Sequence, residues 1–295
     1  MAPLAQSEIE LILKGYAAGD VFGVAYEFSE YSGKVDPQVL REKAGWPYGG
    51  VSDDTFLSLL TIASFDPQSA AASRSKFLSS LHDSISRLRG LGPTTRAALG
   101  LPVNVEEQSQ VGISNGALMR TSLLGLAFQV HEAKARRAFV RELAAATHGR
   151  ESAIASAVIG SALFADARAH GCKHSPFEVA MQERDAIGAD IELIDWQAPI
   201  GNGVSNESVE TLNAVLWALK TSSSVASALS ISCELGGDTD TVAALTASLY
   251  IARNPDKAEF EALTWLGDIQ WNEVPELLPM AVRLYQLYED AKVAP

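Results

Sequence analysis

Apolar residues recur at helical spacing along almost the whole chain, and this periodicity limits the fold more than any other feature. Helical patterns are predicted over 7–19, 54–65, 68–88, 93–99, from 116 past 126, 131–147, 150–169, 206–220, 222–234, 240–253, 257–266 and 276–291. No run alternates between apolar and polar residues with period two, and no Asn-Gly pair lies between β-branched runs. Residues 30–50 and 183–206 are interpreted as mostly loop. We therefore predict an all-α fold.

Composition supports one folded domain and excludes several classes of function. Of the 295 residues, 47% are hydrophobic and 20% are charged, which is enough apolar surface for a packed core. Neither a change in composition nor an internal repeat divides the chain, so we expect a single domain over residues 1–295. The formal net charge is −13. A field of that sign repels phosphate backbones and anionic lipids, so generic nucleic-acid or membrane-surface binding is excluded.

We expect no targeting signal in this sequence. The N-terminal segment MAPLAQSEIE has neither a basic region nor an apolar region of the kind found in signal peptides. No uninterrupted apolar stretch approaches the ~20 residues of a transmembrane helix. Cys172 and Cys233 lie far apart without metal-like spacing, and we expect buried thiols in a reducing compartment. The expectation is a cytoplasmic monomer.

Two short acidic clusters each follow a Gly-Gly pair. The first is Ser52-Asp53-Asp54-Thr55, and the second is Asp238-Thr239-Asp240-Thr241. Both precede an apolar run, so both are expected on a turn at the N-terminus of a helix. Taken singly, each is interpreted as a helix cap, because Asp, Ser and Thr are favoured caps and the helix dipole favours acids there.

Taken together, the clusters indicate a metal site. A cap needs one side-chain oxygen, whereas the pair supplies four carboxylates and their neighbouring hydroxyls. Four carboxylates that share a partly buried place require compensating charge. Hard oxygen donors favour Mg²⁺ or Mn²⁺, while zinc favours His or Cys. If the clusters meet in space, two divalent ions balance the four acids.

Three other segments are candidate functional sites, and each also has an ordinary structural explanation. The turn Ser114-Asn115-Gly116 opens a helix and is suited to an anion, although any capped helix start looks the same. The segment 15–27 combines three glycines with Asp20 and Glu27; the alternative is close helix packing beside an exposed glutamate. His148 lies in a turn between helical patterns, where a lone histidine is usually structural or solvated.

The order of these segments resembles that of the ADP-ribosylglycohydrolase family, which includes the dinitrogenase reductase-activating glycohydrolases and the vertebrate ADP-ribosylhydrolases. The matching segments are GYAAGDVFGVAYE (15–27), VSDDTFLSLL (51–60), SNGALMR (114–120), THGRESAIASAVIGSALFADA (147–167) and GGDTDTVAALTASLY (236–250). The SDDT and GGDTDT pair is the most specific part of the match.

The resemblance implies a compact, single-domain orthogonal helical bundle with a binuclear Mg²⁺ or Mn²⁺ cleft, which removes ADP-ribose from modified proteins or related conjugates. The implied metal ligands are Ser52, Asp53, Asp54, Asp238, Asp240 and Thr241. Ser52 stands where the family has threonine and keeps the hydroxyl. Glu27 is implied to position or deprotonate water, so Glu27, Asp53, Asp54 and Asp240 form the implied catalytic set. Ser114, Asn115 and Gly116 are implied to contact the diphosphate, and His148 to lie near the ribose.

One segment departs from the family pattern. The nitrogenase-regulating members carry a further metal-associated aspartate before a Gly-x-Thr-Thr-like stretch, whereas residues 88–95 here read LRGLGPTT, with no acid. Their specific activity on ADP-ribosyl-arginine is therefore not carried over. Two other functions stay open: a non-catalytic relative similar to lens crystallins of this family, and a metal hydrolase of another ribosyl or nucleotide compound.

Overall fold

The computed structural model of the chain describes residues 4–29, 33–197 and 202–293. Over these residues it consists of α-helices, short 3-10 helices and loops, with two isolated β-bridges, Ser114 to Glu207 and Val204 to Gly237, and no strand. The predicted all-α class is confirmed.

The helices follow one another along the chain, and the longest connections lie between residues 24 and 53 and between residues 187 and 208. The α-helices are α1 (Gln6–Val24), α2 (Asp53–Ser64), α3 (Ala70–Asp83), α4 (Pro93–Ala98), α5 (Gly116–Thr121), α6 (Ala133–Ala144), α7 (Glu151–His170), α8 (Pro176–Ile187), α9 (Ser208–Thr221), α10 (Val225–Glu234), α11 (Thr239–Arg253), α12 (Lys257–Glu261) and α13 (Leu277–Val293). The 3-10 helices are η1 (Ile85–Arg87), η2 (Val105–Gln110), η3 (Ser122–Ala127), η4 (Val130–Glu132), η5 (Leu266–Asp268) and η6 (Trp271–Glu273).

Helix α1 is longer than the sequence pattern predicted. It passes through Gly19 and Gly23 to Val24 because these glycines face α11 at close range. A Cβ atom at Gly19 would overlap the backbone of Ala243, and one at Gly23 would overlap the backbone of Asp240. The missing side chains let the two helices touch along their backbones, and this contact fixes the start of α11 against the end of α1.

Two further differences concern helix boundaries. Helix α8 lies in a stretch that we interpreted partly as loop, yet it has ordinary boundary signals: Ser175 caps it, Pro176 opens it and Gly188, with φ +62°, ends it. The helical pattern after residue 116 is divided into α5 and the 3-10 helix η3.

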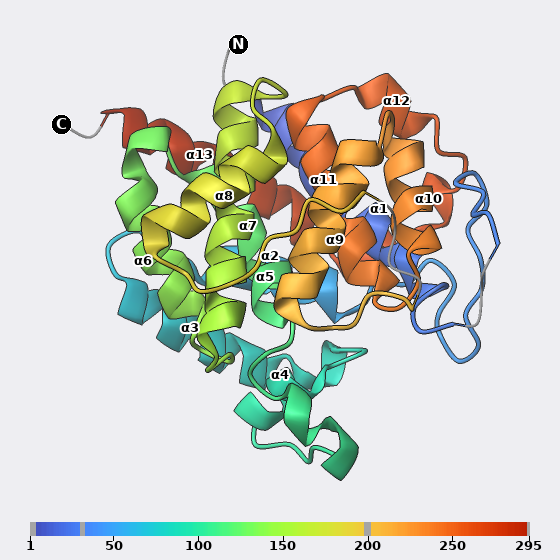
Figure 1. Cartoon of the computed structure of the whole chain (residues 1–295), viewed down its shortest axis with the longest axis horizontal. Helices are drawn as coiled ribbons and strands as arrows, with labels where there is room; N and C mark the ends of the chain where they lie inside the picture. Colours follow the sequence, from blue (N-terminus) through green and yellow to red (C-terminus); the bar gives the residue numbers. More distant parts are fainter. Residues whose placement is uncertain (1–3, 30–32, 198–201, 294–295) are drawn as a thin grey trace.

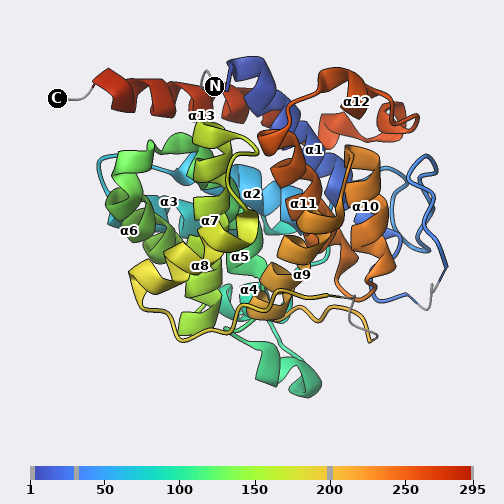
Figure 2. The same cartoon turned by 45° about the horizontal axis from the view of Figure 1, so that its top comes forward.

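The helices pack in two groups around a common core. Helices α1, α9, α10 and α11 lie together on one side, and α7 with α5, α6 and α8 on the other (Figure 1). Helix α13 runs across one end, and the segment with α4 and η2 projects from the opposite end (Figure 2). One hydrophobic cluster reaches from Leu4 to Leu284, and a second, smaller one involves α5, α6 and α7.

Helix α7 has the length and mean hydropathy, 1.2 over its apolar window, of a membrane-spanning helix. The sequence pattern predicted a helix over 150–169 and no transmembrane helix. Of this window, 83% is buried inside the fold. The apolar surface of α7 is thus covered by other helices of the chain, as in the central helix of a packed core.

Candidate metal centre

The first acidic cluster lies at the N-terminus of α2. Ser52 is the N-cap, and its Oγ accepts a hydrogen bond from the backbone N–H of Asp54 at 3.0 Å. Asp53 and Asp54 occupy the first helical turn, so the carboxylates stand beside the positive end of the helix dipole. Because Ser52 alone provides the cap, neither carboxylate is needed for it.

The second cluster lies at the N-terminus of α11 and meets the first. Thr241 Oγ1 donates a hydrogen bond to Asp54 Oδ2 at 2.8 Å. Carboxylate oxygens of Glu27, Asp238 and Asp240 lie within 4.8 Å of one another. The structure therefore brings Glu27, in the turn after α1, together with the starts of α2 and α11 into one acidic centre.

The glycine pair before the second cluster shapes its turn. Gly236 and Gly237 have φ values of +70° and +78°, a conformation that side chains disfavour. In this turn the N–H of Asp238 donates to the carbonyl oxygen of Val204 at 2.8 Å. Asp238 is consequently held outside the regular helix, and Asp240 lies inside its first turn, so both carboxylates face the same centre.

Asn115 connects the predicted substrate turn to the acidic centre. Its Nδ2 donates to Asp238 Oδ2 at 2.5 Å and to Thr211 Oγ1 at 2.9 Å. The side chain of Asn115 thus orients a carboxylate of the centre, and its backbone N–H donates to the carbonyl oxygen of Asn206 at 2.8 Å.

Asp20 is a residue of this site to which sequence reasoning gave no role. Its fully buried carboxylate accepts hydrogen bonds from the backbone N–H groups of Ser52 and Thr55 and from Thr55 Oγ1 at 2.5 Å. It therefore holds the turn that carries Asp53 and Asp54. Burial raises the pKa of Asp20 to about 6, although these hydrogen bonds oppose the shift.

The centre concentrates negative charge in a poorly solvated place. Burial is the largest cause that raises the pKa values of Asp53, Asp54 and Asp240 well above their usual range, and neighbouring carboxylates raise them further. Each of these side chains is buried. The donors are carboxylate and hydroxyl oxygens, and this donor set together with unbalanced charge fits Mg²⁺ or Mn²⁺.

Lys43 approaches the centre from the loop between α1 and α2. Its Nζ lies 2.6 Å from Glu27 Oε2, and the two side chains are 30% and 28% exposed. Glu27 is thus more accessible than the buried aspartates. The loop had no sequence pattern that would have identified Lys43.

His148 lies beneath the Ser114 turn and is buried. One ring nitrogen, Nε2, is 3.1 Å from Ser114 Oγ, and the other, Nδ1, is 2.8 Å from Thr147 Oγ1. Burial, and secondarily the Arg120 guanidinium, lowers the pKa of His148 to about 3. A neutral imidazole therefore supports the turn, and a Cβ atom at Gly116 would lie 3.2 Å from the ring.

A cavity of about 800 Å³ lies elsewhere, between α1, α12 and α13. It is lined by apolar side chains such as Leu11, Phe260 and Trp271 and by none of the acidic residues described above. The two cysteines differ from expectation in one respect: Cys233 is buried, but Cys172 is exposed.

The fold and the site define an all-α protein with a buried centre of carboxylates and hydroxyls at the meeting point of helix ends. The family model for ADP-ribosylglycohydrolases matches residues 3–292, so the chain belongs to that family. It is also similar in fold to a solved "ADP-ribosylglycohydrolase-related protein complex", at 24% identity and a TM-score of 0.66 over 96% of this chain and 98% of that one. Comparison with curated protein sequences gives no match.

Proposed function

We propose that the chain is a metal-dependent hydrolase that cleaves the glycosidic bond at C1″ of ADP-ribosyl groups, with two Mg²⁺ or Mn²⁺ ions. The observation that carries the proposal is the acidic centre itself: Asp54 meets Thr241, and Glu27 meets Asp238 and Asp240. Membership of the ADP-ribosylglycohydrolase family supports the class of substrate.

The residues divide into those that hold ions and those that act on the substrate. The proposed ligands are Ser52, Asp53, Asp54, Asp238, Asp240 and Thr241. Bound divalent ions would supply Lewis acidity and would lower the pKa of a nearby water. Glu27, the more exposed carboxylate, accepts a proton from the attacking water or orients it. The remaining negative charge stabilises the positive character that develops at C1″ as the leaving group departs.

The turn of Ser114, Asn115 and Gly116 borders the substrate in this proposal. Asn115 orients Asp238, and neutral His148 supports Ser114 from below. Both side chains would therefore act by positioning their neighbours. The acid-free segment 88–95 adjoins the centre, since the N–H of Asp53 donates to the carbonyl oxygen of Arg89 at 2.9 Å. We propose that this segment helps to select the leaving group.

The test is hydrolysis of ADP-ribosyl-serine and ADP-ribosyl-arginine peptides with Mg²⁺, with Mn²⁺ and with EDTA. Cleavage of at least one peptide that EDTA abolishes is expected. Glu27→Gln should lower turnover by ~10²–10⁴-fold with nearly unchanged ADP-ribose binding, because the amide keeps the shape but not the basicity. Glu261→Gln, at an exposed position on α12, is the control.

Two outcomes would contradict the proposal. Turnover of Glu27→Gln within twofold of the parent would remove Glu27 from the mechanism. Tight ADP-ribose binding without cleavage of either peptide would favour a non-catalytic binding protein.

A further inference from the structure

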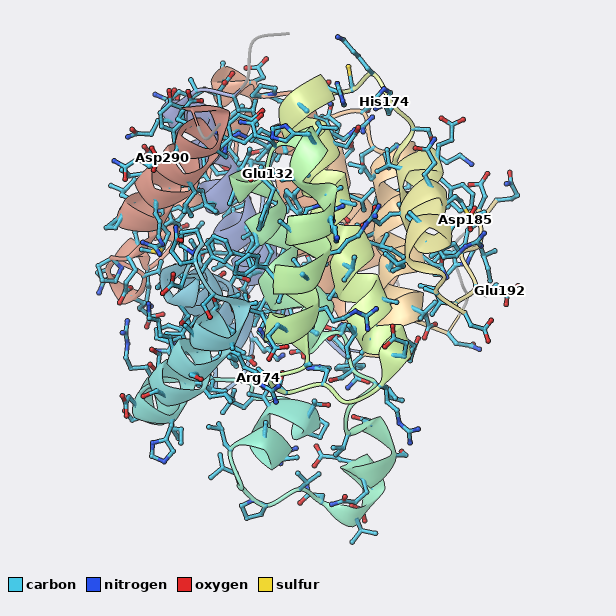
Figure 3. All side chains as sticks on the ribbon, turned by 90° about the vertical axis from the view of Figure 1, so that its left-hand side faces the viewer. Arg74, Glu132, His174, Asp185, Glu192 and Asp290 are labelled. Carbon is cyan, nitrogen blue, oxygen red and sulfur yellow. The ribbon has the colours of Figure 1, made fainter. Side chains whose placement is uncertain are left out.

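A second group of potential metal ligands lies at the end of α7, away from the acidic centre. Oxygen or nitrogen atoms of Asp166, His170 and His174 lie within 4.8 Å of one another. Figure 3 shows His174 at the end of the molecule opposite the projecting segment of α4 and η2. The proposed hydrolysis does not use these residues.

This group is formed by one face of α7 and by the change of chain direction that follows the helix. Asp166 and His170 are four residues apart on α7, so their side chains share one face. Gly171 then ends the helix with φ +62° and ψ −129°. The reversal brings the ring of His174 back to 4.6 Å, between centroids, from the ring of His170.

The position of His174 is held from a third element. Arg253, the last residue of α11, donates through Nη2 to the carbonyl oxygen of His174 at 2.9 Å. The first turn of α11 carries Asp240. Because a helix rises 1.5 Å per residue, the 13 steps from Asp240 to Arg253 place the two groups roughly 20 Å apart. The histidine group is therefore a separate site.

Asp166 has an unused ligand atom. Its Oδ1 lies 2.6 Å from His174 Nδ1, but its Oδ2 is buried and has no hydrogen-bond partner among the described residues. A buried carboxylate oxygen without a partner is costly. A simple Asp166–His174 ion pair would leave this oxygen unsatisfied and would give His170 no role.

We propose that Asp166, His170 and His174 bind one Zn²⁺ ion, with water in the fourth position. Two imidazoles and one carboxylate form a donor set that zinc accepts in tetrahedral sites, whereas the acidic centre, made of oxygen donors, favours harder ions. The ion would tie the end of α7 to the segment that leads into α8. Its effect is therefore on the stability of this region rather than on hydrolysis.

The experiment is a Zn²⁺ titration of the full-length protein, stripped of metal and kept in millimolar Mg²⁺ to occupy the acidic centre. The parent is compared with His170→Gln, His174→Gln and the control His131→Gln, which removes an exposed histidine elsewhere. Circular dichroism and Mg²⁺-dependent thermal stability establish that each variant is folded. Co²⁺, read by its visible absorption, reports the coordination geometry.

One Zn²⁺ per chain is expected in the parent and in His131→Gln. Since loss of outer-shell partners alone costs 10–100-fold in affinity, loss of a ligand should weaken Zn²⁺ binding by at least about 100-fold in the other two variants. A tetrahedral Co²⁺ spectrum should disappear with it. Equal Zn²⁺ affinity and stoichiometry in parent and His170→Gln would overturn the proposal and leave only the ion pair.

Discussion

The hydroxyl of Thr241 donates to the carboxylate of Asp54 at 2.8 Å, although 187 positions separate the two residues. This contact joins the N-termini of α2 and α11. Each helix end contributes roughly half a positive charge, which does not balance the acids that meet there. At α2 the cap is made by Ser52, and Asp238 makes no cap hydrogen bond with its side chain. The carboxylates therefore exceed what capping requires.

The first prediction follows from this surplus of charge. Mg²⁺ or Mn²⁺ that binds the folded state stabilises it by ~2.7 kcal/mol per site at a hundredfold excess over the dissociation constant. For a chain of this size the melting temperature should rise by about 5–10 °C, and EDTA should reverse the rise. Differential scanning fluorimetry measures it. A melting temperature insensitive to both ions and to EDTA would indicate helix caps alone.

Asp240→Asn sharpens that measurement. The substitution should reduce the Mg²⁺-dependent rise, because it removes a ligand. The free energy of unfolding of the metal-free protein should change little, because the substitution removes repulsion with Asp54 and Asp238. In the parent this repulsion contributes to the raised pKa of Asp240. Equal metal responses in the parent and the variant would exclude Asp240 as a ligand.

The sequence allowed the helices and the acidic clusters to be predicted, because both depend on local patterns. Helical spacing marks the helices, and Gly-Gly followed by acids marks the turns. Asp20 was named within the candidate segment 15–27, but its role was not predicted, because that role depends on a turn 32 residues later. Lys43 lies in a loop without periodicity. His174 joins Asp166 only through the backbone reversal at Gly171.

Asp20→Asn tests this positioning role. The asparagine amide would direct a donor at N–H groups that now donate to a carboxylate, and hydrogen bonds to charged groups contribute about 1.5–3 kcal/mol. We expect the free energy of unfolding to fall by about that amount in urea titrations, with weaker Mg²⁺ binding. Asp36→Asn, on an exposed turn, should change stability by less than about 0.5 kcal/mol. Unchanged stability and metal affinity in Asp20→Asn would show that the turn forms without it.

Lys43→Met should increase the affinity for Mn²⁺. The lysine ammonium beside Glu27 repels a cation bound at the acidic centre, and a unit charge about 4 Å away in water contributes about 1 kcal/mol, or roughly fivefold. Lys14→Met is the control, since Lys14 pairs with Glu10 in the first half of α1, whereas Glu27 lies after the end of that helix. Isothermal titration calorimetry would measure both. A weaker Mn²⁺ affinity in Lys43→Met would mean that the lysine stabilises the site instead of repelling the cation.

His148→Gln should make the protein less sensitive to mild acid. Burial lowers the pKa of His148 to about 3, whereas the unfolded chain takes up the proton near its ordinary value of 6.5. Between these two pH values the unfolded state binds one more proton than the folded state. The contribution of neutral His148 to the free energy of unfolding is therefore complete above pH 6.5 and is lost as the pH falls. The loss is about 1.4 kcal/mol per pH unit, or about 2 kcal/mol at pH 5.

Glutamine keeps hydrogen-bonding groups near Ser114 and Thr147 but does not titrate. Urea unfolding at pH 7 and pH 5 should therefore show the stability gap between parent and variant narrowing by about 2 kcal/mol. His131→Gln, at an exposed position, should give the same gap at both pH values. If His148→Gln also gave a constant gap, the imidazole would bind its proton equally well in the folded and unfolded chain, and the description of His148 as a neutral support beneath the Ser114 turn would be wrong.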